Sequence, residues 1–431
     1  MASEPDTENP WAATTIWGKA VAKISGRVPF VHSRKDSSKD LDHQFRQELE
    51  AISTQMPSQF LASEQPATSE AGHLIIHGVA GSGKTLMLCA HAQELAEGLR
   101  AKRSLTPILV LCYNEPLAVW LQQQLHSKGL QSWIVVRHFH RWCREQLLHF
   151  QLELPPKTLT PSAQMKDLVD RVIQGLSNGS IPTGQYSAVL VDEAHDFSGP
   201  WLAMLTHLPT PETNHLELYF DDAQSMFKRK RTSRIQFKRL GIHTHQVQRL
   251  TINHRNTAPI FNAAQRMAGP LIEPQDTPDS AIPRLKPLSS QRPGPAVLLF
   301  PMANLRAQGR KTTELLQQAH QSEGTAWGNM AVLCSNRFQM DVCNGALRYQ
   351  RIPHQLRKGF GEFNPQEDTV KIMSLNACSG LEFDVVVIVD SGEPPTNEAE
   401  LEEKQRQLYI AATRAKHRLY IVGLGQPESD S

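Results

Sequence analysis

No apolar run in the sequence approaches the roughly 18 to 20 residues that a membrane-spanning helix needs. Runs such as DVVVIV, residues 384–389, have the length of a strand instead. The opening residues, MASEPDTENPW, contain acids and lack the basic start and apolar core of a secretory signal. From these absences we expect a cytoplasmic protein with no membrane partner.

Cysteine is scarce, because the chain of 431 residues has only 6 and none of them forms a CxxC pair. This argues against a disulfide framework and against a zinc site, so we expect reduced, mostly buried thiols. The 18 histidines also lack partner ligands at metal-site spacing, and we expect no metal except one carried by a nucleotide. The sequence also has no large excess of one charge, since it contains 45 basic and 43 acidic residues. Only local clusters of basic residues can therefore indicate nucleic-acid binding.

The length exceeds that of one hydrophobic core and predicts two compact domains. From residue 74 onward, apolar runs alternate with longer amphipathic stretches, which is typical of a parallel sheet flanked by helices. A Pro-rich segment interrupts this pattern, and a second alternating set follows it. The predicted division is an N-terminal extension (1–60), a first α/β domain (61–245) with a minimal insertion at about 145–185, a second α/β domain (246–425) containing the Pro-rich segment (269–295), and a tail (426–431).

The segment GVAGSGKT, residues 78–85, matches the phosphate-loop pattern GxxxxGK[ST] and stands between an apolar run and an amphipathic one. In such a loop, backbone N–H groups close around phosphate oxygens and the helix N-terminus adds positive potential. We expect Lys84 to reach the outer phosphates and Thr85 to hold Mg²⁺. The predicted nucleotide-binding residues are Gly78, Val79, Ala80, Gly81, Ser82, Gly83, Lys84 and Thr85.

An acidic segment, VDEAHDF at residues 191–197, follows the apolar run AVL and places two acids at a strand end. Asp192 is expected to hold the magnesium shell, and Glu193 to orient or deprotonate the attacking water. Together with the phosphate loop, this predicts a Mg²⁺-dependent ATP hydrolase. Arg255 and Arg414 are candidates for the cations that phosphoryl transfer needs, although an arginine alone is more often a surface ion-pair residue.

The ordered segments GVAGSGKT, VLCYNEPLA, VRHFHRWC, LVDEAHDF, DDAQSMF, LTINHRNT, IMSLNACSGLEF and EKQRQLYIAATRA resemble the superfamily 1 helicases of the UvrD/Rep type. The resemblance runs from about residue 61 to residue 423. It implies two RecA-like domains of the P-loop NTPase class, with ATP and Mg²⁺ in the cleft between their parallel sheets.

The resemblance also implies roles for particular residues. Gln224 would sense the γ-phosphate, Arg255 and Arg414 would act as arginine fingers, and Glu382 would contact the nucleotide sugar. Gln65 resembles the glutamine that reads adenine ahead of the phosphate loop.

Candidate nucleic-acid contacts match the family's strand-binding segments and are Tyr113, Asn114, His138, Phe139, His140 and Asn376. Aromatic faces there could stack on bases, but burial of Phe139 in the core of the first domain is an equal alternative. The basic run KRKRTSR at 228–234, with Lys238 and Arg239, could track phosphates or be a solvated loop.

Three departures from the family pattern limit the expected activity. Asn376 and Ser379 stand where the family usually has histidine and lysine, and KRKR follows DDAQSMF where the family commonly has a base-stacking aromatic. The spacing also leaves little room for the family's large accessory domains, which makes translocation a safer expectation than efficient duplex separation.

The leading hypothesis is therefore an ATP-dependent DNA helicase or translocase that moves on single-stranded DNA or tailed duplex. By resemblance it would move 3′ to 5′, in repair, recombination or defence. A different hypothesis is a nucleotide-gated module whose closure recruits or licenses a partner such as a nuclease. An RNA-directed helicase is a third, because contacts to the backbone carry little information about the sugar.

Overall fold

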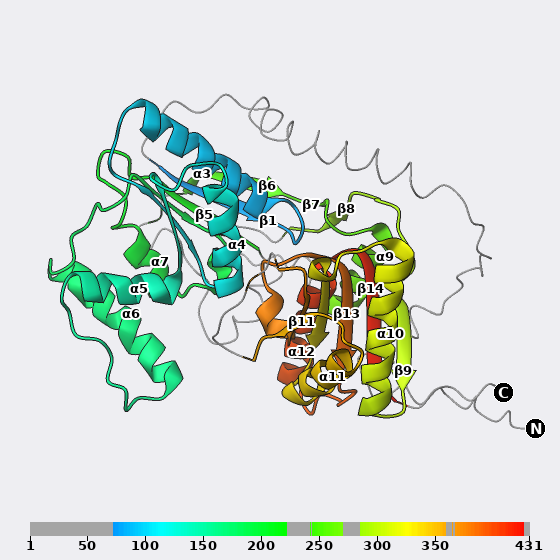
Figure 1. Cartoon of the computed structure of the whole chain (residues 1–431). Coiled ribbons are helices and arrows are strands. Elements are labelled where there is room, and N and C mark those ends of the chain that lie inside the picture. The colour runs from blue at the N-terminus through cyan, green and yellow to red at the C-terminus, as the bar shows by residue number, and fades with distance from the viewer. Residues whose placement is uncertain are drawn as a thin grey trace, which may run out of the picture.

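The computed structural model describes residues 72–221, 242, 244–269, 285–358, 364 and 367–425. Within them the chain forms two six-stranded parallel sheets that lie side by side, each with helices on both faces (Figure 1). The predicted α/β class with parallel sheets is confirmed. Among the helices of these residues, none combines the length and apolar character that a bilayer crossing requires.

The first sheet has the strand order β3-β2-β4-β5-β1-β6, with every neighbouring pair parallel. Its last strand reaches Leu250, past residue 245, where the sequence predicted the first domain to end. The elements of this half are β1 (His73–Gly78), α3 (Lys84–Ala101), β2 (Ile108–Cys112), α4 (Glu115–His126), β3 (Ile134–His138), α5 (Phe139–His149), α6 (Pro161–Ser177), β4 (Ala188–Val191), η1 (Ala194–Asp196), α7 (Gly199–Leu205), β5 (Leu216–Phe220) and β6 (Thr244–Leu250).

The second sheet has the order β11-β12-β10-β13-β14-β9 and is also parallel throughout. A short pair, β7 with β8, stands between the two sheets in the chain. The elements of this half are β7 (Ile252–Asn253), α9 (Ala258–Ala268), β8 (Leu288–Ser289), β9 (Leu298–Met302), α10 (Leu305–Glu323), η4 (Trp327–Asn329), β10 (Met330–Cys334), α11 (Arg337–Tyr349), β11 (His354–Leu356), β12 (Val370–Ser374), η5 (Leu375–Cys378), β13 (Phe383–Asp390), α12 (Glu398–Ala412) and β14 (Ala415–Leu424).

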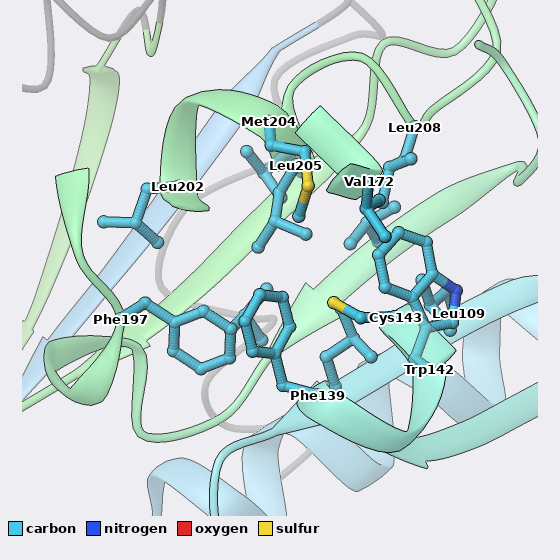
Figure 2. Close-up of a cluster of buried hydrophobic side chains, with 14 of the residues drawn as sticks. Leu109, Phe139, Trp142, Cys143, Val172, Phe197, Leu202, Met204, Leu205 and Leu208 are labelled. Carbon is cyan, nitrogen blue, oxygen red and sulfur yellow. The ribbon is translucent and has the colours of Figure 1, made fainter. Parts of the chain in front are cut away.

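Both sheets are buried on their two faces, which is why their central strands are almost continuously apolar. In the first half, α3 and α4 cover one face while α5, α6 and α7 cover the other. Figure 2 shows part of the core beneath α5, α6 and α7, which includes Phe139, Trp142, Phe197 and Leu205. In the second half, α9 and α12 cover one face while α10 and α11 cover the other.

Helix starts in the second half follow local sequence signals. Asn304, Asn336 and Asn397 precede α10, α11 and α12, and each side chain accepts a hydrogen bond from a backbone N–H in the first turn. Such caps satisfy one of the donors that a helix N-terminus leaves without an intrahelical partner. The helices therefore begin directly after these asparagines.

Candidate functional site

The predicted phosphate loop connects β1 to α3, as its pattern requires. Gly81 and Gly83 have φ angles of +68° and +92°, a region that favours glycine. A Cβ at Gly81 would also lie 2.9 Å from the Cβ of Arg255 and 2.9 Å from Oδ1 of Asn253. The loop therefore packs directly against the segment that follows β7, and only glycine fits at this contact.

Lys84 lies beneath the loop and is almost completely buried. Its Nζ donates to the carbonyl oxygens of Gly78 and Val79, both at 2.9 Å, and to Oδ2 of Asp221 at 3.2 Å. Burial alone would raise the pKa of Asp221, but the charges of Lys84 and His195 outweigh it and lower that pKa. Because Asp221 stands at the end of β5, the ion pair fixes Lys84 at the carboxyl edge of the first sheet.

The acidic segment meets the loop at Thr85, whose Oγ1 donates to Oδ2 of Asp192 at 2.8 Å. Asp192 directly follows β4 and is fully buried. Burial raises the pKa of its carboxyl to about 6, and the neighbouring charge of Glu193 raises it too. The Thr85 hydroxyl and the Asp192 carboxylate therefore lie next to each other, as two oxygen ligands of one magnesium ion would.

Glu193 has an unfavourable backbone conformation, with φ +51° and ψ 43°. Its N–H donates to Oδ1 of Asp192 at 2.9 Å. The side chain is buried, and its Oε2 has no hydrogen-bond partner among the described residues, although Nδ1 of His195 lies 3.5 Å away. A strained backbone that carries a buried, incompletely satisfied carboxylate is the kind of cost that proteins accept at functional sites.

Across from these groups, the second half presents two arginines. Arg255 lies in the turn after β7, and its Nη1 donates to the carbonyl oxygen of Thr413 at 3.3 Å. Arg414 follows α12 and is 2 % exposed; its guanidinium donates to the carbonyl oxygens of Ile410 and Leu381. Burial, and then the nearby charge of Arg255, lower the pKa of Arg414. The two guanidiniums are therefore near enough to interact, while Glu382 forms an ion pair with Arg255.

Residues of both halves line a cleft of about 670 Å³ between the carboxyl edge of the first sheet and the amino edge of the second. The structure brings most of the predicted nucleotide-site residues together there, while Asp192 lies behind the lining. Predicted residues in the lining are Ala80, Gly81, Ser82, Gly83, Lys84, Thr85, Glu193, Arg255, Glu382 and Arg414. Gln65 and Gln224 lie outside the described residues, as does the basic run 228–234 with Lys238 and Arg239.

The candidate nucleic-acid residues are more dispersed. Phe139 is completely buried in the core of the first half, so no face of its ring is available to a base in this structure. Tyr113 stacks on Trp201 with ring centroids 6.2 Å apart and meets the ring of His140 edge-on. Burial lowers the pKa values of His138 and His140, in the latter to about 4, so both are neutral at pH 7.

Two of the candidate amides lie in or against the η5 loop. The Nδ2 of Asn114 donates to the carbonyl oxygens of Ser379 and of Ala377, the latter at 3.4 Å. Asn114 precedes α4 and η5 belongs to the second half, so this amide bridges the two halves. Asn376 is exposed on η5 itself.

The cleft lining also contains charged residues that were not predicted from the sequence, among them Asp221, Lys416 and Arg292. Asp221 stands in the DDAQSMF segment, and its position after an apolar strand could have indicated a role. Lys416 carries no motif that distinguishes it from a surface lysine. Arg292 lies in the segment interpreted as a Pro-rich linker, and its Nη2 donates to the carbonyl oxygen of Lys416 at 2.7 Å.

Comparison with known proteins finds a similarity in the C-terminal part of the chain. Residues 361–424 match the UvrD-like helicase C-terminal domain. A solved structure, the C-terminal domain of a possible DNA helicase from Lactobacillus plantarum, is 17% identical with a TM-score of 0.29, over 40% of this chain and 89% of that one. No match was found among curated proteins. The predicted resemblance to UvrD-like helicases is confirmed by this match over residues 361–424.

Proposed function

We propose that the protein is an ATP hydrolase of the superfamily 1 type, in which two RecA-like domains bind ATP and Mg²⁺ in the cleft between them. The observation that carries this proposal is the composition of the cleft. One wall holds a phosphate loop and a strained glutamate, while the other holds two converging arginines.

The donor set fits a magnesium-bound triphosphate. Ser82 Oγ is buried without a hydrogen-bond partner among the described residues, and a phosphate oxygen would supply one. Lys84 would hold the outer phosphates, while Thr85 and Asp192 would hold the metal ion, which neutralises charge on the phosphates when bound. Glu193 would orient and deprotonate the attacking water, and Arg255 with Arg414 would stabilise the charge that develops in the transition state.

Hydrolysis coupled to a strand would make the protein a translocase. Because residues of both halves line the cleft, nucleotide binding and release would change how the halves meet, and strand contacts on each half would alternate. By the family's properties, the strand would be single-stranded DNA and the movement 3′ to 5′. The paired rings of Tyr113 and Trp201 support a stacking surface on the first half.

The nucleotide-gated module is a second candidate, and the bridge made by Asn114 favours it. This amide, expected to touch a strand, instead joins the first half to the backbone of η5. Closure of the cleft would then be transmitted through η5 to a bound protein rather than to DNA.

Steady-state ATP hydrolysis with and without single-stranded DNA or RNA tests the proposal. We expect Lys84→Ala to abolish hydrolysis, and Glu193→Gln to retain ATP binding while turnover falls by a factor of about 10² to 10⁴. Stimulation by DNA that is lost in Glu193→Gln supports the motor. A basal rate that neither nucleic acid changes favours the gated module, and full hydrolysis by Lys84→Ala protein would rule out the assigned site.

A further inference from the structure

Glu382 is held by two cations at the rim of the cleft. Its Oε2 lies 3.0 Å from Nε of Arg255, and its Oε1 lies 2.8 Å from Nζ of Lys416. The three residues come from separate segments, namely the residue before β13, the turn after β7 and the second residue of β14. Both carboxylate oxygens are therefore already engaged, and one of the predicted arginine fingers is engaged with them.

The geometry lets Arg255 change partner without moving its backbone. The chain on either side of it is fixed, since the N–H of His254 donates to the carbonyl oxygen of Gly81 at 2.9 Å. The Cβ of Arg255 lies directly against Gly81 of the phosphate loop. The guanidinium itself is held through Nε by Glu382 and through Nη1 by the carbonyl oxygen of Thr413.

The electrostatics keep Glu382 ionised. Its place in the cleft lining withdraws it partly from water, which alone would raise its pKa, but the charges of Arg255 and Lys416 lower the pKa to about 2. At neutral pH the carboxylate therefore competes with any other anion for Arg255. A ligand gains Arg255 only if it offers more negative charge than one carboxylate.

We infer that Glu382 is an anionic competitor that holds Arg255 until a polyphosphate displaces it, and that this exchange limits how tightly the cleft binds a polyphosphate. Lys416 stays paired with the Glu382 carboxylate and balances its negative charge after Arg255 leaves. The inference rests on the proposed function of the cleft. It differs from the sugar contact implied by family resemblance, because it predicts that loss of Glu382 strengthens binding.

The test measures binding of two probes, ATP and inorganic tripolyphosphate, to the full chain by isothermal titration calorimetry. Tripolyphosphate has the charge of the phosphate chain but no sugar. We expect Glu382→Gln to bind both probes roughly three- to tenfold more tightly than the wild type, since Arg255 no longer has to leave a partner. Glu382→Asp keeps the charge but withdraws it by one methylene, and it should also tighten binding.

Two controls isolate the exchange. Asp368→Asn removes the same charge from an exposed carboxylate at the rim that accepts a hydrogen bond from the N–H of Gly328, and we expect less than a twofold change. In an Arg255→Gln background, Glu382→Gln should give no further gain, which is the coupling that a double-mutant cycle detects.

Each other outcome has a distinct meaning. Weaker ATP binding by Glu382→Gln with unchanged tripolyphosphate binding would establish a sugar contact and overturn the inference. Equal gains in Glu382→Gln and Asp368→Asn would reduce the effect to net charge and also overturn it. If the variants show either of these patterns while the wild type hydrolyses ATP, the proposed function still stands. If the wild type binds neither probe, both the inference and the proposed function are wrong.

Discussion

At the residue scale, two features of Glu193 destabilise the folded protein. Its φ of +51° is unfavourable for a side chain with a Cβ, and its carboxylate lies next to Asp192, whose pKa it helps to raise. We expect Glu193→Gln to remove the repulsion and to stabilise the folded protein by about 1 kcal/mol. Thermal unfolding without nucleotide measures this, with Glu97→Gln on the exposed face of α3 as the control. A lower unfolding temperature for Glu193→Gln would contradict this explanation.

A second residue-scale feature is the buried network around Glu217 on β5. Its carboxylate contacts Nδ1 of His91 at 3.0 Å, Nε2 of His215 at 2.7 Å and the hydroxyl of Tyr219 at 2.7 Å. Burial would raise the pKa of Glu217, but hydrogen bonds and charge from both histidines lower it below its ordinary 4.5. For His91, burial would lower the pKa, but Glu217 raises it above 6.5.

These opposite shifts define a pH window. The raised pKa of His91 stabilises the fold fully below about pH 6.5, and that contribution is lost as the pH rises through the folded-state pKa. The lowered pKa of Glu217 stabilises the fold above about pH 4.5, and that contribution is lost as the pH falls. The network therefore contributes most to the stability of the fold between about pH 4.5 and about pH 6.5.

We expect Glu217→Gln to lower the free energy of unfolding by about 1 to 3 kcal/mol near pH 5.5, because buried partners lose a charged acceptor. The deficit should shrink at pH 8.5, because the contribution of His91 is lost as the pH rises through its folded-state pKa. Urea unfolding of both proteins at the two pH values measures it. A deficit that grows with pH would show that His91 is not charged in the folded protein.

At the element scale, the contact between α4 and the loop after η5 joins the two halves. Gly380 has φ +77°, and a Cβ there would lie 2.6 Å from Cδ2 of Leu117, which is fully buried. We expect Gly380→Ala to weaken this contact and lower the unfolding temperature. Gly345→Ala in α11 is the matched control, since its added methyl meets nothing within 4 Å and should stabilise the helix by roughly 0.5 to 1 kcal/mol. Equal effects of the two substitutions would contradict the role assigned to Gly380.

The elements differ in how far their sequences predict them. The central strands are predictable because long apolar runs such as VVVIV fit only a doubly buried strand. β6 is not, because THQVQRL is largely polar and becomes a strand by pairing with β1 at the sheet edge. The helix α6 falls in the region expected to be a minimal insertion, and β8 falls in the segment expected to be a linker. β6 and β8 depend on pairing between distant segments, which leaves no local periodicity to detect.

At the scale of the whole molecule, the cleft unites the two halves, so a ligand in it should stabilise both at once. We expect Mg²⁺ with ATP to raise the free energy of unfolding of Glu193→Gln protein by about 2.7 kcal/mol at a hundredfold excess over Kd, in a single transition. Lys84→Ala protein should show no shift. Calorimetric scans check this, and two transitions of which only one moves would place the ligand on one half alone.

The site was predictable to the extent that each of its halves has a local motif. The phosphate loop, Asp192 and Glu193 follow strands in a recognisable order, and the structure brings them together with Arg255 and Arg414. The ion pairs of Glu382 and the bridge of Asn114 were not predictable, because they depend on how two separately folded sheets meet.

The strand order also has a consequence for how the protein is made. β1 lies between β5 and β6, and β14 lies between β13 and β9, so β1 and β9 pair with neighbours that are synthesised much later. A nascent chain that has emerged only as far as β5 still presents one unpaired edge of β1, and β9 stays without its neighbour β14 until that strand leaves the ribosome. Unpaired edges of this kind invite association with other chains. The growing polypeptide therefore depends on prompt elongation, or on a chaperone, at two separate stages of translation.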